Sequence, residues 1–330
     1  MSDNKYIDAV TRIHIKENDL LSADFLEQLV QAADYDACLQ LLSEKGWGCG
    51  GQKDGQLVSE NVKEIIKSER DRAWDLMREV LHEDIRKLDI FLIPIDYHNL
   101  KAAIKETRAE HAYEDIYMDQ GAFPAEMVRE AVQKKDFGEL PERMAKVGEE
   151  ALGVFLRTGD GQLCDVMIDK AAVEELVATA DKTDSDALKE YAELTAVSAN
   201  IKTALRAMLT GKDQEFLEKA LAECKTLNKT ALIKSALVGI DEMVDYLSGT
   251  AYGDGSAEFD KSMAAFERWC DNLLIERMKI QKWNPFGIDP LVAYVLACEN
   301  ERKSVRVILS GKQNGLPEEA IRERIRETYA

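Results

Sequence analysis

The chain has 330 residues, of which 45% are hydrophobic and 32% are charged, so it is long enough for two or three cores. Its 62 acidic and 43 basic residues give a net charge of −19, which argues against nucleic acid as a partner, because phosphate binding needs a basic surface. The same charge argues against lying directly on an anionic membrane. The excess of acidic residues favours solubility, or it forms an acidic face that steers the chain toward a basic partner.

The first predicted elements, in chain order, are a glycine-rich loop and a long helix. The loop at 46–51 lacks the Gly-Lys-Ser/Thr ending of a phosphate-binding loop and follows no strand, so it is interpreted as a flexible connection. Residues 58–92 have apolar side chains three and four apart, and Ser59 is a helix start signal. They predict one long helix.

Two further helices are predicted in the second half of the chain. The pattern at 172–210 predicts a helix interrupted near 183–186. The pattern at 289–308 predicts another, with Asp289 as N-cap and Pro290 at the first helical position. The remaining loops are expected at 159–161, 248–255 and 283–287. No segment alternates strictly between apolar and polar residues, so a sheet protein is excluded, although a two-stranded element stays open.

No motif for catalysis or metal binding is found. The four histidines lack metal-ligand spacing, and no Gly-x-Ser-x-Gly is present. The segment 158–165 has the wrong ligand spacing for a calcium loop and is interpreted as an ordinary turn. We therefore expect no enzyme activity, no cofactor and no metal.

Cysteine usage and hydropathy indicate a cytoplasmic protein. The six cysteines form no Cys-x-x-Cys pair, which is typical of buried free thiols in a reducing cytosol: Cys38, Cys49, Cys164, Cys224, Cys270 and Cys298. The N-terminus is polar and charged, so no signal peptide is expected. The longest apolar run, 90–95, is far shorter than the roughly 20 residues of a membrane span.

The most informative feature is a repeat at a spacing of about 100 residues. Asn99, Asn200 and Asn300 are each followed by a basic residue two positions on, an aliphatic residue five on and a basic residue six on. A weaker copy opens the chain with Val10 in the asparagine position. Self-similarity at a fixed period indicates one helical unit used several times.

The repeat extends into a second helix. Segments 124–130 and 317–323 resemble each other, with looser echoes at 22–26 and 213–217, and each carries an acidic residue in its first turn. The Gly-Lys pairs at 211–212 and 311–312 are interpreted as helix ends, with glycine in the left-handed cap. The unit is thus a helix, a turn and a second helix.

These copies predict an all-α fold of three similar helical lobes with a pseudo-threefold arrangement, and the family resemblance described below further implies a funnel shape. The boundaries are expected at 1–105, 106–210 and 211–330, and the N-terminal helix is expected to pack near the C-terminal helices. An open solenoid is the competing arrangement.

The basic residues of the repeat are the candidate partner-binding residues. Positions two and six lie one helical turn apart, so each copy presents a basic edge beside its apolar face. These basic edges are Lys101/Lys105, Lys202/Arg206 and Arg302/Arg306, with Arg12 in the opening copy. Their side chains either cover the core while their heads pair with neighbouring acids, or they surround one surface that an acidic or polar partner grips.

The C-terminal sequence resembles a known family. The stretch Asn-Pro-Phe-Gly-Ile-Asp-Pro-Leu-Val-Ala-Tyr at 284–294, and the segments 299–301 and 306–324, look like the ending of the C subunits of bacterial and archaeal V-type ATPases, whose eukaryotic counterpart is the d subunit. The opening 6–22 and residues 96–101 also resemble this family. Val10 departs from the asparagine that usually occupies this position in the family.

The resemblance implies a non-catalytic adaptor on the cytoplasmic face of the membrane, one copy per complex. It would join the central shaft to the membrane rotor ring and couple ATP turnover to H⁺ or Na⁺ transport. The attachment is expected to be peripheral, through protein contacts without lipid insertion. Trp47, Trp283 and Phe286 are possible anchors, although burial is the favoured fate of each. The alternative is a helical-repeat scaffold unrelated to ATPases.

Overall fold

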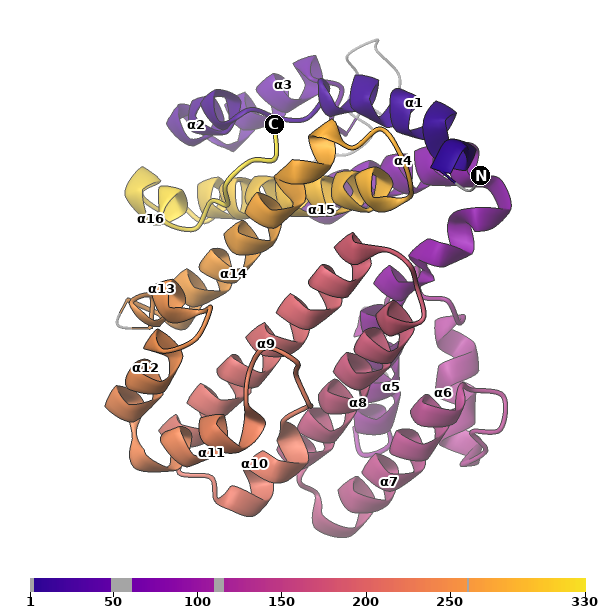
Figure 1. The fold of residues 1–330 in the computed structure, drawn as a ribbon, viewed down its shortest axis with the longest axis vertical. Coiled ribbons are helices and arrows are strands. Elements are labelled where there is room, and N and C mark those ends of the chain that lie inside the picture. Colours follow the sequence, from indigo (N-terminus) through magenta and orange to yellow (C-terminus); the bar gives the residue numbers. More distant parts are fainter. Residues whose placement is uncertain (1–2, 49–60, 110–115, 260) are drawn as a thin grey trace. The chain divides into compact units, whose positions relative to one another are not determined.

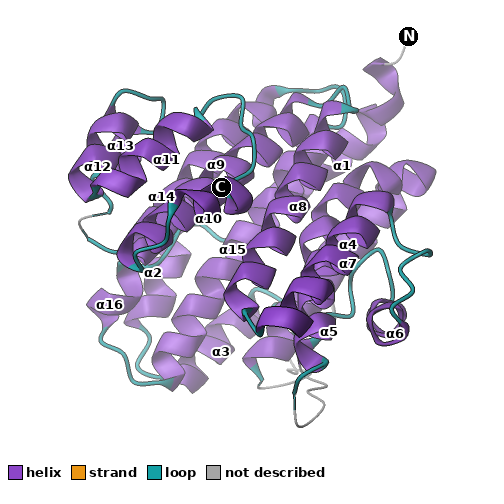
Figure 2. Cartoon of the chain, turned by 90° about the horizontal axis from the view of Figure 1, so that it is seen from below, coloured by secondary structure: helices purple, strands orange, loops and turns teal. Residues whose placement is uncertain are grey.

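The chain forms an all-α fold in a computed structural model that describes residues 3–48, 61–109, 116–259 and 261–330, and no strand occurs among them (Figures 1 and 2). It divides into two compact units. Unit 1 comprises 1–85, 185–188 and 257–330, and unit 2 comprises 86–184 and 189–256. The division into three lobes and the funnel shape stay predictions.

Unit 1 is built around the last long helix. Its elements are η1 (Asp3–Tyr6), α1 (Ile7–Glu17), α2 (Ala23–Gln31), α3 (Tyr35–Glu44), α4 (Val62–Leu81), α14 (Met263–Met278), η4 (Lys279–Trp283), α15 (Asp289–Gln313) and α16 (Glu318–Arg322). Helix α15 contacts α1, α2, α3, α4, α14 and α16, so segments from both ends of the chain share one core. Val305, Leu309 and Ile321 pack there against Leu29 and Ile66.

Unit 2 contains the middle of the chain. Its elements are α5 (Ile93–Glu106), α6 (Ala125–Lys134), α7 (Glu142–Thr158), α8 (Gly161–Asp181), most of α9 (Asp186–Leu209), α10 (Gln214–Ala220), α11 (Lys229–Val238), α12 (Ile240–Ser248) and α13 (Gly253–Ser256). The 3₁₀ helix η2 (His82–Leu92) leads into α5. Leu100, Ile104, Val128 and Phe155 belong to one buried cluster formed with α6, α7 and α8.

The sequence patterns predict the helices themselves and some of their ends. The expected interruption at 183–186 separates α8 from α9. All four second helices of the repeat are present as α2, α6, α10 and α16, each with an acidic residue in its first turn. The apolar residue at the same position in each is buried, namely Leu26, Val128, Leu217 and Ile321. The repeat therefore describes a real helix pair.

Other predicted helix ends are wrong. The N-cap of α15 is Ile288, without a side-chain cap, so Asp289 and Pro290 are the first and second helical residues, and the helix runs on to Gln313. Helix α8 begins at Gly161, well before the expected residue 172. The helix expected at 58–92 ends at Leu81, because His82 takes a left-handed backbone (φ 51°) and a 3₁₀ helix follows. Its N-cap is Asn61, whose side chain accepts from the Lys63 N–H, while Ser59 lies outside the described residues. Gly211 has φ 63° at the end of α9, as predicted, but Gly311 lies inside α15, and Gly315 (φ 64°) follows its end. A Cβ at Gly311 would stand 2.6 Å from Ile321 Cγ1, so glycine lets α16 approach α15.

The repeated asparagine has the same structural role in the copies at Asn99 and Asn200, and part of that role in the copy at Asn300. The Asn99 side chain donates to Met118 O (2.9 Å) and accepts from Met118 N (2.8 Å). Asn200 binds both backbone groups of Ala222 in the same way, at 2.8 and 2.9 Å. Each amide is buried and satisfies the polar backbone of an irregular segment that returns to the helix. We call this arrangement the asparagine clasp.

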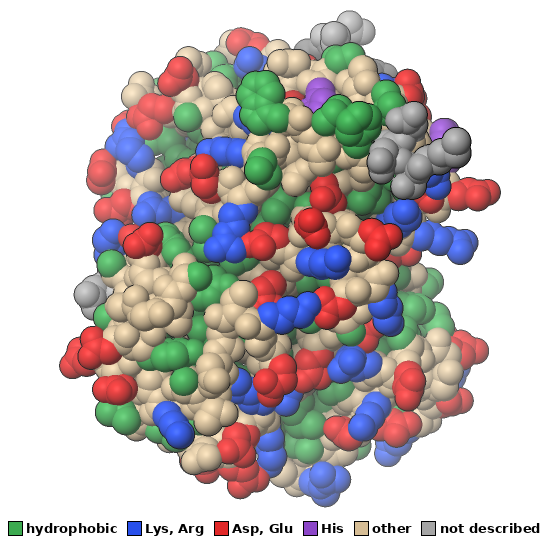
Figure 3. Space-filling model, viewed as in Figure 1, with side chains coloured by type: hydrophobic (Ala, Val, Ile, Leu, Met, Phe, Trp, Pro, Cys, Tyr) green, Lys and Arg blue, Asp and Glu red, His purple; other side chains and the backbone are tan. Residues whose placement is uncertain are grey.

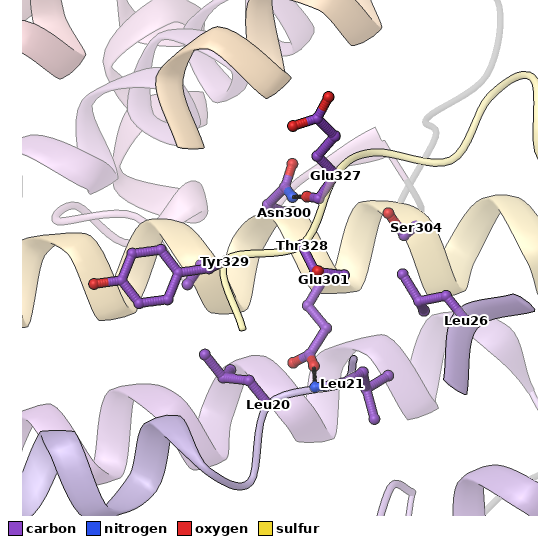
Figure 4. A pocket seen from close by; sticks show the side chains of 10 residues that line it. Leu20, Leu21, Leu26, Asn300, Glu301, Ser304, Glu327, Thr328 and Tyr329 are labelled. Carbon is purple, nitrogen blue, oxygen red and sulfur yellow. Dashed lines mark hydrogen bonds between the residues drawn. The ribbon is translucent and has the colours of Figure 1, made fainter. Parts of the chain in front are cut away.

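The third clasp holds the C-terminal segment against α15 (Figure 4). Asn300 Nδ2 donates to Glu327 O at 2.6 Å, whereas its buried Oδ1 has no partner among the described residues. The Glu327 N–H donates instead to Asn272 Oδ1 of α14 at 2.9 Å. Two residues later, Tyr329 is buried. This segment therefore completes the core of unit 1.

We expect Asn200→Ala to lower the free energy of unfolding by about 2–4 kcal/mol, because it leaves a buried N–H and a buried C=O of Ala222 unpaired. Asn300→Ala removes one hydrogen bond and is expected to cost about half as much. Urea unfolding of both variants measures the difference. A cost below about 1 kcal/mol for Asn200→Ala would show that the clasp is dispensable.

Candidate interaction surfaces

The first basic edge lies in unit 2 and is occupied by acids of the same unit. Lys101 Nζ lies 2.6 Å from Asp169 Oδ1, and Lys105 Nζ lies 2.7 Å from Asp165 Oδ2, so α5 is tied to α8. Such partly exposed pairs contribute about 0.2–1 kcal/mol each. This geometry favours the interpretation in which the lysine heads pair with neighbouring acids.

The basic residues of the copy on α9 and of the opening copy on α1 have different surroundings. On α9, Lys202 is half-buried and Arg206 is exposed, and both interact with neighbouring groups. Arg12 of α1 pairs with Glu79 of α4 at 2.6 Å on the surface of unit 1. The candidate residues thus divide between the two units, and their arrangement around one opening stays a prediction.

In the last copy the two arginines have opposite environments. Arg302 is buried and forms an ion pair with Glu299 one turn earlier. Arg306 is exposed and has no ion-pair partner within the described part of the chain. The edge therefore consists of one structural arginine and one arginine that is free for a partner.

A basic stripe on α4 joins this last edge. Lys63, Lys67 and Arg70 are spaced four and three apart, which places them on one side of α4. Arg70 lies close enough to Glu299 and Arg302 to interact electrostatically, and burial lowers the pKa of Arg70. Lys63 and Lys67 are exposed, and in the described ranges neither has an ion-pair partner. We call these three residues, with the exposed Arg306, the α4–α15 basic surface. The buried Arg302 is not part of it.

The clustering of these cations is unusual in so acidic a chain. Like charges one turn apart destabilise a helix by a few tenths of a kcal/mol. The acidic groups nearby are Glu299, which forms an ion pair with Arg302, Glu69 and Glu301, which interact electrostatically with Arg302, and Glu64 and Asp71 of α4. The α4 residues are absent from the predicted set because they lie outside the repeat, although their spacing is visible in the sequence.

A second kind of surface is formed by exposed apolar turns in unit 2. Leu209 ends α9, and Leu237, Val238 and Ile240 form the α11–α12 corner at Gly239. Both turns lie at the end of unit 2 that is lowest in Figure 1. In unit 1, Trp47 is buried as expected, whereas the favoured burial of Trp283 and Phe286 is wrong, since both are exposed.

Glu301 of α15 is a half-buried carboxyl next to Arg302. It accepts a hydrogen bond from the Leu21 N–H (Figure 4) and interacts electrostatically with Glu69, Arg72 and Arg302. Burial raises the pKa of Glu301 from 4.5 to about 7, because the charged form loses its hydration. This carboxyl fastens the segment after α1 to α15.

The described residues contain no group of three or more His, Cys, Asp and Glu side chains placed to hold a metal ion. The five described cysteines are free thiols, while Cys49 and His111 lie outside the described ranges. Burial raises the pKa of Cys38 and Cys164 to about 11, so these thiols are poor nucleophiles. No helix in the described part of the chain is long and apolar enough to cross a membrane.

An all-α chain of repeated helix pairs with these surfaces matches one known family. Residues 9–324 match the family model described as ATP synthase (C/AC39) subunit. The chain therefore belongs to the C/AC39 family of ATP synthase subunits.

Relatives from bacteria and archaea align over nearly the whole chain. It is 25% identical over 329 residues to the C subunit of the V-type ATP synthase of Thermus thermophilus, with 98% of each chain covered. It is 22% identical over 322 residues to the C subunit of the V-type sodium ATPase of Enterococcus hirae, covering 95% of this chain and 96% of that protein. The C subunit of the A-type ATP synthase of Methanocaldococcus jannaschii is 24% identical over 348 residues, covering 96% and 84%.

Charge reversal is expected to affect stability very differently at the two arginines of the last copy. Arg302→Glu places a buried carboxylate beside Glu299 and is expected to cost at least about 3 kcal/mol. Arg306→Glu is expected to change the free energy of unfolding by no more than about 0.5 kcal/mol. Urea unfolding of both variants gives the comparison. Equal costs would contradict the assigned environments.

Stability is expected to fall as the pH rises through about 7, because the raised pKa of Glu301 means that the folded state binds this proton more tightly than the unfolded chain. The contribution is full below pH 4.5 and is lost above the folded-state value. It is on the order of 3 kcal/mol. Asp96, whose pKa burial raises to about 6, adds a slope of the same sign.

Glu301→Gln keeps an acceptor for the Leu21 N–H but removes the titration. Unfolding free energies at about pH 5 and pH 8 should therefore differ less in this variant than in the unmodified chain. An unchanged pH slope would exclude Glu301 as its source.

Proposed function

We propose that this chain is a rotor adaptor that joins the central shaft of a V/A-type ATPase to its membrane rotor ring. It transmits torque, couples ATP hydrolysis or synthesis to H⁺ or Na⁺ transport, and has no active site of its own. The observation that carries this proposal is the end-to-end similarity to proteins named as the C subunits of such ATP synthases. We place it on the cytoplasmic face, one copy per complex, held by protein contacts.

The surfaces of the chain support distinct docking roles. In this proposal the α4–α15 basic surface and the exposed ends of the basic edges hold the shaft. Several charge-assisted contacts can resist torque without a sequence-specific pocket. The exposed apolar turns at Leu209 and Val238 meet the loops of the ring. The acidic remainder repels the anionic bilayer.

Co-purification with the rotor ring and the central shaft tests this function. The tagged full-length chain should recover both, and isolated chain should bind neither ATP nor protein-free anionic vesicles. Stoichiometric ATP binding would favour an enzyme. Purification without any other ATPase component would favour a helical-repeat scaffold unrelated to ATPases.

The double variant Arg206→Glu/Arg306→Glu should weaken shaft binding by at least about tenfold and leave the fold intact, because both side chains are exposed. The residual binding should become less sensitive to salt as cations are removed. Titration of the chain with the purified shaft proteins at two salt concentrations measures both effects.

Lys182→Glu/Lys234→Glu is the matched control, since it makes the same charge change at two other exposed sites. If the control weakens binding as much as the test variant does, the shaft is held by the net charge of the chain and not by the basic edges. Unfolding of the test variant would instead assign the arginines to internal ion pairs.

A further inference from the structure

The four cations of the α4–α15 basic surface have no ion-pair partner in the described part of the chain. Lys63 and Lys67 are exposed on α4, Arg70 is half-buried on the same helix, and Arg306 is exposed on α15, which packs against α4. On the face of the molecule in Figure 3, by contrast, Lys and Arg side chains lie among Asp and Glu side chains. The surface is therefore a local excess of positive charge on a chain whose net charge is −19.

The acidic groups around this surface do not neutralise it. Glu299, which interacts electrostatically with Arg70, forms its ion pair with the buried Arg302. Glu64 and Asp71 each follow a cation of α4 by one residue, which places them about 100° further round the helix. In the described ranges neither of them forms an ion pair with one of the four cations.

The cations of α4 recur once per helical turn. Lys63, Lys67 and Arg70 are four and three residues apart, so they extend about 10 Å along α4. A second helix lying alongside α4 presents carboxylates at the same interval when its acidic residues are three or four positions apart. Side chains on one face of an extended strand recur only about every 6.6 Å and lose register with the cations by the third contact. The spacing therefore favours a helical partner segment.

Arg70 is placed to make the strongest single contact. Burial lowers the pKa of its guanidinium, because the charged form loses part of its hydration. A carboxylate brought to this position accepts two parallel N–H bonds from the guanidinium in a partly dehydrated environment, where charge-assisted hydrogen bonds are strong.

We propose that the α4–α15 basic surface binds an acidic α-helix of the central shaft, whose carboxylates, spaced three and four residues apart, face Lys63, Lys67 and Arg70. This inference rests on the proposed function and adds the chemistry and the secondary structure of the partner segment. Like charges one turn apart on α4 destabilise the free chain, and carboxylates between them relieve this repulsion. Side chains kept at a cost to stability are typical of functional sites.

Titration of the full-length chain with the purified central-shaft proteins at two salt concentrations tests the proposal. Lys63→Gln/Lys67→Gln should raise the Kd at least about tenfold and make it less sensitive to salt. Its melting temperature should stay unchanged or rise slightly, because a repulsion is removed. Lys182→Gln/Lys234→Gln, which neutralises two exposed lysines elsewhere, should keep the Kd within about twofold.

A conservative variant tests the role assigned to Arg70. Arg70→Lys keeps the positive charge but removes the planar pair of donors, so the Kd should rise at least about threefold. An unchanged Kd would contradict the two-bond contact with a carboxylate.

Carbodiimide cross-linking identifies the partner segment, because the reagent joins lysine amines to carboxylates that touch them. Mass spectrometry should find Lys63 and Lys67 joined to Asp or Glu residues three or four positions apart in one shaft segment. Cross-links to scattered carboxylates would contradict a single acidic helix.

Normal shaft binding by Lys63→Gln/Lys67→Gln would overturn this inference and leave the proposed function standing. If the unmodified chain bound neither the shaft nor the rotor ring, the proposed function would fail and this inference with it. Lysine-dependent binding to vesicles of phosphatidylcholine and phosphatidylglycerol in equal parts, with shaft binding intact in the variant, would assign the surface to lipid and overturn the inference as well.

Discussion

The fold depends on how an all-helical chain satisfies the backbone of its irregular segments. A segment that packs on a helix has no neighbouring strand to bond with, and a buried unpaired N–H or C=O costs about 1–3 kcal/mol. The buried amides of Asn99 and Asn200 solve this with one donor and one acceptor each, bound to a single residue 19 and 22 positions further on. The helices around them can then pack with apolar residues alone.

One repeated pattern gives its basic side chains different environments. The two basic positions of each copy are equivalent on the helix, yet Arg302 is buried against Glu299 while Arg306 is open to solvent. In the copy at 99–105, both lysines form ion pairs with aspartates of α8. The repeat therefore places basic side chains at the same helical positions in every copy, and the neighbouring helix determines which of them stays exposed.

The helix pairs and the all-α class could be predicted from the sequence because they follow from local patterns. The end of α4 could not, since nothing in the periodicity before His82 signals a left-handed residue there. Gly311 has the sequence context of a cap, but its role is the close approach of Ile321 across a helix pair, which no local pattern reveals. The direction of each basic edge was also beyond prediction: periodicity fixes the side of a helix, but Asp165 and Asp169 lie 60 and 68 residues further on.

The burial of Tyr329 has a consequence for synthesis. Unit 1 joins residues 1–85 to residues 257–330, and its core closes over this late side chain. The middle of the chain leaves the ribosome before α15 does, so unit 2 can acquire its contacts while the N-terminal helices still lack α15. During that interval Leu29, Val30 and Ile66 lack the apolar cover that Val305, Ile308 and Leu309 supply in the folded unit, which leaves hydrophobic surface exposed to aggregation.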